Sequence, residues 1–138
     1  MDTQTSQEVI SDTGKSKMVK DAVGAFPAAK WENQLAHKFI HHVFFWLKNP
    51  GSSEDKKKLL AGLKRLSGAK TIRMSHIGIP AGTNREVIDT SYDVSWLLVF
   101  DNPEDQESYQ IDPMHLKFIE DCSMLWQKVV VYDVVEEG

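Results

Sequence analysis

The sequence predicts an α+β fold, in which a four-stranded antiparallel sheet carries helices on one of its faces. Four segments after residue 37 are rich in aromatic and β-branched residues, which favour strands. Two segments between them repeat apolar residues at helical spacing. The resulting order is β-α-β-β-α-β, which is the ferredoxin-like, split βαβ arrangement.

The first predicted strand is the segment KFIHHVFFWLK, residues 38–48. Successive side chains of a strand point to opposite faces of its sheet. One face of this strand carries His41 and Phe45, and the other carries His42, Phe44 and Trp46. Because both faces are largely apolar, we expect both to be buried.

The first predicted helix follows the turn segment NPGSSED. Ser52 or Ser53 provides an N-cap, and acidic residues directly after them suit the positive end of a helix. A stripe of leucines then indicates the buried side of the helix, and Gly68 ends it. The stripe consists of Leu59, Leu60, Leu63 and Leu66.

Two further strands are predicted over residues 70–79 and 92–101. In the first, Ile72, Met74 and His76 are expected to share a face, as alternation requires. The second alternates more regularly and joins the first through a long polar connection. Its shared face is predicted to carry Tyr92, Val94, Trp96, Leu98 and Phe100.

The second helical segment is interrupted at Asp112-Pro113, because proline cannot continue a helix interior. We expect a first piece from Pro103 to about Ile111 and a second piece that begins at Pro113. The second piece is predicted to carry an apolar stripe, and residues 128–135 form the last strand. The stripe consists of Leu116, Ile119, Leu125 and Trp126.

Length and composition fit one water-soluble domain with a core of its own. The chain has 138 residues, 41% of them hydrophobic, and no apolar run near the roughly 20 residues of a membrane span. The net charge is −4 and the basic residues are scattered, so nucleic-acid binding is not expected. The single Cys122 and the polar N-terminus predict a protein of the reducing cytoplasm.

The chain divides into an extension and a domain. Residues 1–37 are predicted to be an N-terminal extension, with a flexible beginning rich in Thr, Ser, Gln and Asp. Within it, apolar spacing over 17–25 indicates a short helix or an irregular arm. Residues 38–138 form the folded domain.

The apolar pattern of the outer strands predicts a homodimer. Two helices cover only one face of such a sheet, and the last strand is apolar on both faces, like the first. A bare apolar sheet face is rare on a monomer, so a second copy related by a two-fold axis is expected to cover it. The alternative is that the N-terminal extension covers this face.

Three stretches together resemble a known family: HHVFFWLK near residue 42, SYDVSWLLVFDNPEDQESYQIDPMHLKF over 91–118, and VVVYD near the end. They resemble the stress-responsive A/B barrel family, also called Dabb, over residue 38 to about 135. His41 and the Tyr-x-x-x-Pro-x-His spacing of the chain are the more specific marks. The resemblance implies a ferredoxin-like fold and a dimeric α/β barrel formed by two sheets.

The resemblance also implies candidate functions. Many family members have no assigned reaction, whereas a branch similar to olivetolic acid cyclase closes polyketides without a cofactor, using a tyrosine and a histidine at the positions of Tyr109 and His115. The usual motif has His-Pro-x-His, and this chain has Asp112 in place of the first histidine. Some family dimers hold a structural magnesium on backbone carbonyls, here around residues 63–69; no other metal or cofactor is expected.

The residues themselves allow two interpretations of Tyr109 and His115. A helix N-terminus favours neutral imidazole, which is the form a general base needs, and a phenol can donate a hydrogen bond to a developing enolate. A carboxylate at Asp112 favours the charged imidazole and opposes this effect. The alternative is structural, with Asp112 as an N-cap and the two rings as ordinary packing.

A cavity between sheet and helices is the predicted binding site, lined by His41, Phe45, Trp96 and Trp126. Aromatic residues at these spacings also suit a filled core. The leading interpretation is a homodimeric Dabb-like domain of unassigned role, whose cavity near Tyr109 and His115 binds or transforms a small apolar carbonyl compound. The alternatives are a non-enzymatic stress or structural homodimer and a cofactor-independent monooxygenase, a group that shares the dimeric barrel.

Overall fold

The computed structural model describes residues 33–137, and the fold lies in the unit Leu35–Gly138. The predicted tail and the predicted helix or arm over 17–25 therefore lie outside the described residues. The order of elements confirms the predicted β-α-β-β-α-β pattern, with the second helix in two pieces. The elements are β2 (Phe39–Leu47), α1 (Ser53–Leu66), β3 (Met74–Gly78), β4 (Val94–Phe100), α2 (Pro103–Gln110), α3 (Pro113–Cys122), a 3-10 turn η2 (Ser123–Leu125) and β5 (Trp126–Val135).

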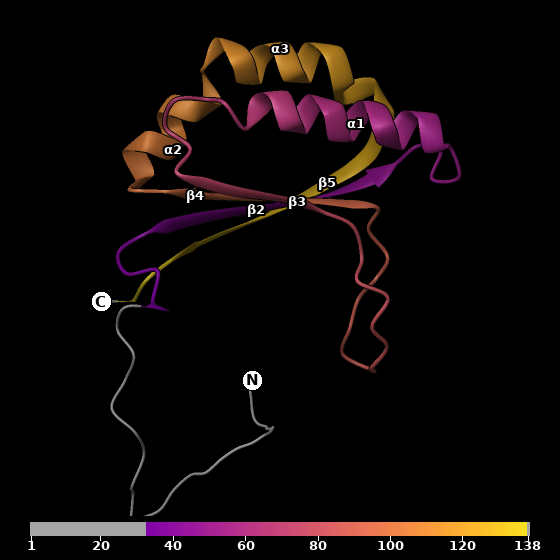
Figure 1. Ribbon diagram of the computed structural model, residues 1–138, viewed down its shortest axis with the longest axis horizontal. Helices are drawn as coiled ribbons and strands as arrows, with labels where there is room; N and C mark the ends of the chain where they lie inside the picture. Colours follow the sequence, from indigo (N-terminus) through magenta and orange to yellow (C-terminus); the bar gives the residue numbers. More distant parts are fainter. Residues whose placement is uncertain (1–32, 138) are drawn as a thin grey trace, which may run out of the picture. The chain divides into compact units, whose positions relative to one another are not determined.

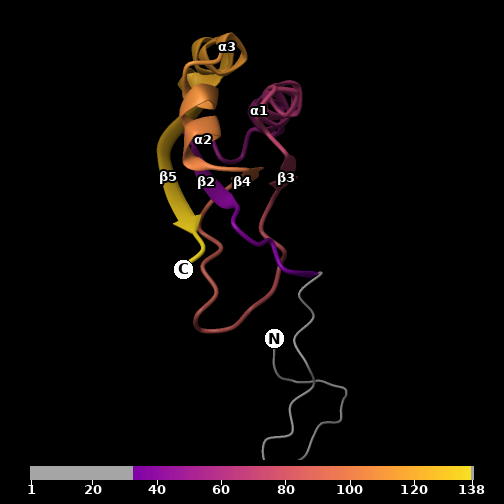
Figure 2. The same ribbon diagram turned by 90° about the vertical axis from the view of Figure 1, so that its left-hand side faces the viewer.

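The four strands form one antiparallel sheet in the order β3-β4-β2-β5. The first and last strands of the domain are therefore neighbours, and β2 occupies a central position. Figures 1 and 2 show the helices together on one face of this sheet. We call this the helix-side face and the opposite one the open face.

The core lies between the helix-side face and the helices. The odd residues of β2 from His41 to Leu47 are buried there, which confirms their predicted common face. The even residues, which were also expected to be buried, are only half-buried in the described chain. Their register partners on β4 include Trp96 and Leu98, each almost fully buried. The leucine stripe of α1 completes the core with Leu59, Leu63 and Leu66. Burial of such side chains contributes about 1.5–3 kcal/mol each to folding.

The helix boundaries follow from local capping chemistry. The Ser52 hydroxyl accepts a hydrogen bond from the backbone N–H of Asp55, which confirms the predicted N-cap of α1. Asn102 caps α2 in the same way. The break at Asp112-Pro113 is also confirmed, because Asp112 is the N-cap of α3 and Pro113 is its first residue.

Three sequence assignments were wrong in detail. Trp126 does not belong to the second helix, since α3 ends at Cys122, Leu125 lies in η2, and Trp126 begins β5. Tyr92 lies before β4, and its ring contacts Phe44 on the face opposite to the predicted one. The carboxylate of the next residue, Asp93, accepts a hydrogen bond from the Leu47 N–H.

Ile72 also lies outside its predicted strand, because β3 begins only at Met74. The backbone N–H of Ile72 donates to the carbonyl of Ala69, so this residue belongs to the turn after α1. Its side chain packs against the core, whereas Met74 lies on the open face and is 58% exposed.

The open face carries apolar side chains from all four strands. Its central positions on β2 and β4 are partly shielded by their neighbours, whereas Tyr132 and Val134 on the outer strand β5 are more than half exposed. No described helix packs on this face (Figure 2). Nor is any helix among residues 33–137 long and apolar enough to cross a membrane.

Candidate functional site

A cavity of about 160 Å³ lies between the helix-side face and the α2–α3 corner. All six residues that the sequence predicts for the site line it. They are His41, Phe45, Trp96, Tyr109, His115 and Trp126. Val129 and Val131 of β5 and Ile119 of α3 add aliphatic walls, so the cavity is apolar with a few polar groups.

The helix break brings Tyr109 and His115 together. Tyr109 lies in the last turn of α2, and its side chain points into the core, where only 2% of the residue is exposed. The Asp112 carboxylate accepts from the Met114 N–H and starts α3 one residue later. His115 thus occupies the first turn of α3, with its ring centroid 4.6 Å from that of Tyr109.

The hydrogen bond of His115 fixes its tautomer. Nδ1 lies 3.1 Å from the carbonyl oxygen of Gln110, and a carbonyl only accepts. Nδ1 therefore carries the proton, and Nε2 keeps its lone pair free. Burial lowers the pKa of His115, with a smaller contribution from His41, while the Gln110 carbonyl and Asp112 act in the opposite direction. The neutral form that a general base requires is thus favoured near pH 7.

Tyr109 is held as a neutral hydrogen-bond donor. The indole Nε1–H of Trp96 donates to the phenol oxygen at 3.4 Å, which leaves the hydroxyl proton free for another acceptor. Burial raises the pKa of Tyr109 to about 12. The phenol therefore stays protonated at neutral pH, as an enolate-stabilising group must.

His41 adds a third ring, supported by a carboxylate. Its Nδ1 lies 2.6 Å from Oδ1 of Asp133, its register partner on β5. The imidazole is 7% exposed, and its centroid lies 6.1 Å from that of Tyr109. Since a carboxylate only accepts, Nδ1 of His41 carries a proton and the ring orientation is fixed.

A family model described as the stress responsive A/B barrel domain, Dabb, matches residues 39–136, most of the chain. The chain belongs to this family. The match confirms the resemblance inferred from the sequence motifs, and it begins at the start of β2 and ends just after β5.

Solved structures share the fold of this Dabb domain at low sequence identity. A Dabb family protein from Mesorhizobium loti is 23% identical, with a TM-score of 0.61 over 73% of this chain and 98% of its own. A dimeric ferredoxin-like protein of unknown function from Thermobifida fusca is 14% identical, with a TM-score of 0.61 over 74% and 93%. A hydroxynitrile lyase from Passiflora edulis is 18% identical, with a TM-score of 0.63 over 73% and 94%. No functionally curated protein matches the chain.

Two polar contributors to this Dabb site were missed at the sequence level. Asp133 is the acid inside the apolar segment VVVYDVV, which is a signal that it serves a specific partner. Its partner could not be identified, because His41 lies 92 residues away and only the sheet register joins them. The Gln110 carbonyl leaves no signal in the sequence, since every residue has one.

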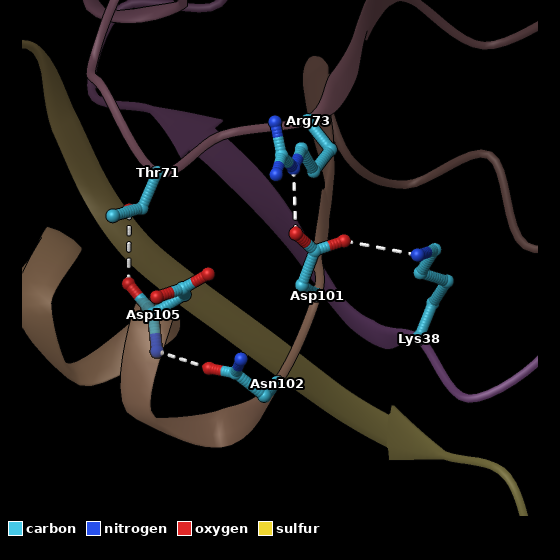
Figure 3. Close-up of polar contacts among 6 residues, drawn as sticks. All are labelled: Lys38, Thr71, Arg73, Asp101, Asn102 and Asp105. Carbon is cyan, nitrogen blue, oxygen red and sulfur yellow. Dashed lines mark hydrogen bonds and ion pairs between the residues drawn. The ribbon is translucent and has the colours of Figure 1, made fainter.

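A larger, more open hollow of about 510 Å³ lies near the start of β2 and the end of β5. Its charged groups are already paired (Figure 3): the Asp101 carboxylate accepts from Lys38 at 2.9 Å and from Arg73 at 2.6 Å. These two hydrogen bonds lower the pKa of Asp101. Because these groups satisfy one another, the smaller cavity beside His115 is the better candidate site.

The carbonyls around residues 63–69, where the resemblance implies a structural magnesium, accept hydrogen bonds at the end of α1. Those of Leu63, Arg65 and Leu66 accept hydrogen bonds from the N–H groups that follow them, and that of Lys64 accepts from the Ser67 hydroxyl. Residues 33–137 also contain no cluster of three His, Cys, Asp or Glu side chains suited to a metal.

Proposed function

We propose that this Dabb domain binds a small carbonyl compound beside His115 and catalyses a proton transfer on it without a cofactor. One observation carries the proposal: a free imidazole Nε2 and a free phenol proton line the same apolar cavity. Together they provide the base and the oxyanion donor that enolisation requires.

In the proposed step, Nε2 of His115 removes a proton from the carbon next to the carbonyl. The electron pair of the broken C–H bond forms a C=C bond, and the π pair of the carbonyl moves onto its oxygen, which gives an enolate. The Tyr109 hydroxyl donates a hydrogen bond to that oxygen, which stabilises the developing negative charge. The His115 imidazolium then returns its proton, either to the carbon or to the alkoxide that a condensation forms, and becomes neutral again.

The cavity limits the size of the compound. A cavity of about 150 Å³ is known to hold one benzene molecule, and the volume here is about 160 Å³. We therefore propose a substrate with one ring, or an aliphatic body of similar size, and a carbonyl group. A hydroxynitrile lyase from Passiflora edulis shares this fold, which supports an enzymatic role for the domain.

We further propose that the domain works as a homodimer in which a second copy covers the open face. The exposed apolar side chains of β3 and β5 support this assembly, since such faces are rarely left bare. Related proteins from Thermobifida fusca and Bacteroides fragilis are described as dimeric. Cys122 is a buried free thiol, which supports a location in the reducing cytoplasm.

A purely structural homodimer is the second candidate function. It is favoured by the modest volume of the cavity, which is below the roughly 300–1,000 Å³ of most ligand sites. In that case the rings of Tyr109 and His115 serve only to pack the α2–α3 corner.

Hydrogen exchange distinguishes these two functions. One-ring ketones and aldehydes that raise the melting temperature are incubated with the protein in D₂O, and exchange of the proton next to the carbonyl is followed by NMR. We expect exchange above the buffer rate, reduced roughly 10²–10⁴-fold in His115→Gln and roughly 10²–10³-fold in Tyr109→Phe. The control is His37→Gln, at an exposed histidine that does not line the cavity. Exchange that survives in both site variants contradicts the proposal.

A further inference from the structure

Two histidines lie in one row across the open face. The register pairs His76 of β3 with Leu97 of β4, Leu97 with His42 of β2, and His42 with Tyr132 of β5. Because neighbouring strands are about 4.8 Å apart, the two histidines are separated by about 10 Å with Leu97 between them.

His42 is half-buried beside an aromatic ring, whereas His76 on the edge strand β3 is exposed in a single copy. The ring of His42 lies 4.3 Å from that of Phe44, centroid to centroid. That of His76 lies over Gly78, where an added Cβ would be 2.9 Å from Cε1 of His76. Burial lowers the pKa of His42, with a further contribution from the charge of His76. The neutral form of His42 is therefore already favoured in a single copy.

The described strands provide no carboxylate on this face to pair with an imidazolium. On β5 the open face carries Lys128 and Tyr132, and Asp133 points to the other face, where it binds His41. β3 and β4 contribute no acid. Beyond the strands, Glu136 contacts His37, and Asp89 of the β3–β4 connection interacts with Lys128.

We propose that protonation of His42 and His76 releases the second copy that covers the open face, so that the homodimer dissociates as the pH falls. The inference rests on the homodimer proposed above. A copy laid on this face removes water from four histidines, and without a nearby carboxylate each must be neutral. The dimer is therefore most stable above the free histidine pKa of about 6.5 and is weakened as the pH falls through that value.

The magnitude follows from proton linkage. Consider a histidine that has a pKa of about 6.5 in the free chain and stays neutral in the dimer. It makes the dimer Kd at pH 6.0 about fourfold higher than the Kd at high pH. Four such histidines give at most about 300-fold, and the lowered pKa of His42 reduces its share. General charge acts in the opposite direction, because a chain of net charge −4 repels its copy less as the pH falls.

The test is sedimentation of the full chain at pH 7.5 and 6.0, with circular dichroism to verify that it stays folded. We expect Kd to rise at least about fivefold at pH 6.0. The rise should be lost in His42→Gln/His76→Gln and kept in His37→Gln, a matched control outside the row. A smaller rise, or the same rise in the double variant, overturns the inference and leaves the homodimer intact. A monomer at both pH values overturns the homodimer itself.

If the double variant does not dimerise at pH 7.5, a second measurement on the unmodified chain tests the inference. The pKa values of both histidines in the unmodified chain are measured by NMR at protein concentrations below and above Kd. Both values should fall at the higher concentration, whereas values independent of concentration overturn the inference.

Discussion

Gly62 permits the close approach of α1 and α3, and replacing it by alanine tests how much that approach contributes to stability. A Cβ at residue 62 would lie 2.8 Å from Sγ of Cys122 and 3.2 Å from the Phe118 ring. Real Cβ atoms essentially never approach another heavy atom below 3.0 Å. The helices must therefore separate or the two buried α3 side chains must shift.

Two opposing terms set the expected magnitude. Alanine is better than glycine by about 1 kcal/mol in a helix interior, and Gly62 is an interior residue of α1. Overpacking a close contact costs about 1–3 kcal/mol, and here two buried side chains are displaced at once. We expect overpacking to exceed the gain, with a net loss of about 1 kcal/mol and a fall in Tm of about 4–8 °C.

The assay is thermal and urea unfolding of Gly62→Ala beside Gly51→Ala. Gly51 is the control, because an added Cβ there meets nothing within 4 Å. In a Cys122→Ala background the closest clash is removed, so Gly62→Ala should cost at least about 1 kcal/mol less there. If Gly62→Ala stabilises the chain as much as Gly51→Ala does, or costs the same in both backgrounds, the proposed contact does not limit the helix approach.

Three further predictions concern the α2–α3 corner and its neighbour. Asp133→Ala leaves the Nδ1–H of buried His41 unpaired and should cost about 1–2 kcal/mol in urea unfolding, a value reduced because Asp133 is 46% exposed; no loss argues against this hydrogen bond. An NMR titration should give His115 a pKa below 6.5, because its ring is partly buried. The stability that neutral His115 contributes is then present above pH 6.5 and is lost as the pH falls. A measured pKa at or above 6.5 contradicts this burial. Asp112→Ala removes the N-cap of α3 and should lower stability by about 1 kcal/mol, and an unchanged midpoint would mean that the cap is dispensable.

Local chemistry explains why much of the fold could be predicted. Alternation along β2, the Ser52 cap and the Asp112-Pro113 break each depend on residues close in sequence. The boundary before Trp126 does not, because Leu125 and Trp126 fit a helical stripe as well as a strand start. Here η2 redirects the chain without a Gly or Pro that would mark the change.

The candidate site was only partly predictable for a related reason. The six lining residues follow from periodicity, family resemblance and the α2–α3 break, but the hydrogen bonds that fix their protons do not. The Asp133 contact of His41 depends on the register of β2 with β5. The Gln110 contact of His115 depends on the path of the backbone at the break. Neither the strand register nor the backbone path can be predicted from residue types at a fixed spacing.

Adjacent His41 and His42 show how one strand can face two proposed sites. Because side chains alternate with a period of two, His41 faces the helices and Asp133, whereas His42 faces the open side in a row with His76. A shift of one residue in the β2 register would exchange them, which would place His42 under the helices and expose the apolar core positions. The burial of Leu47 and Phe45 on the His41 face opposes that shift. The same core packing therefore keeps one histidine at the cavity and the other at the proposed dimer face.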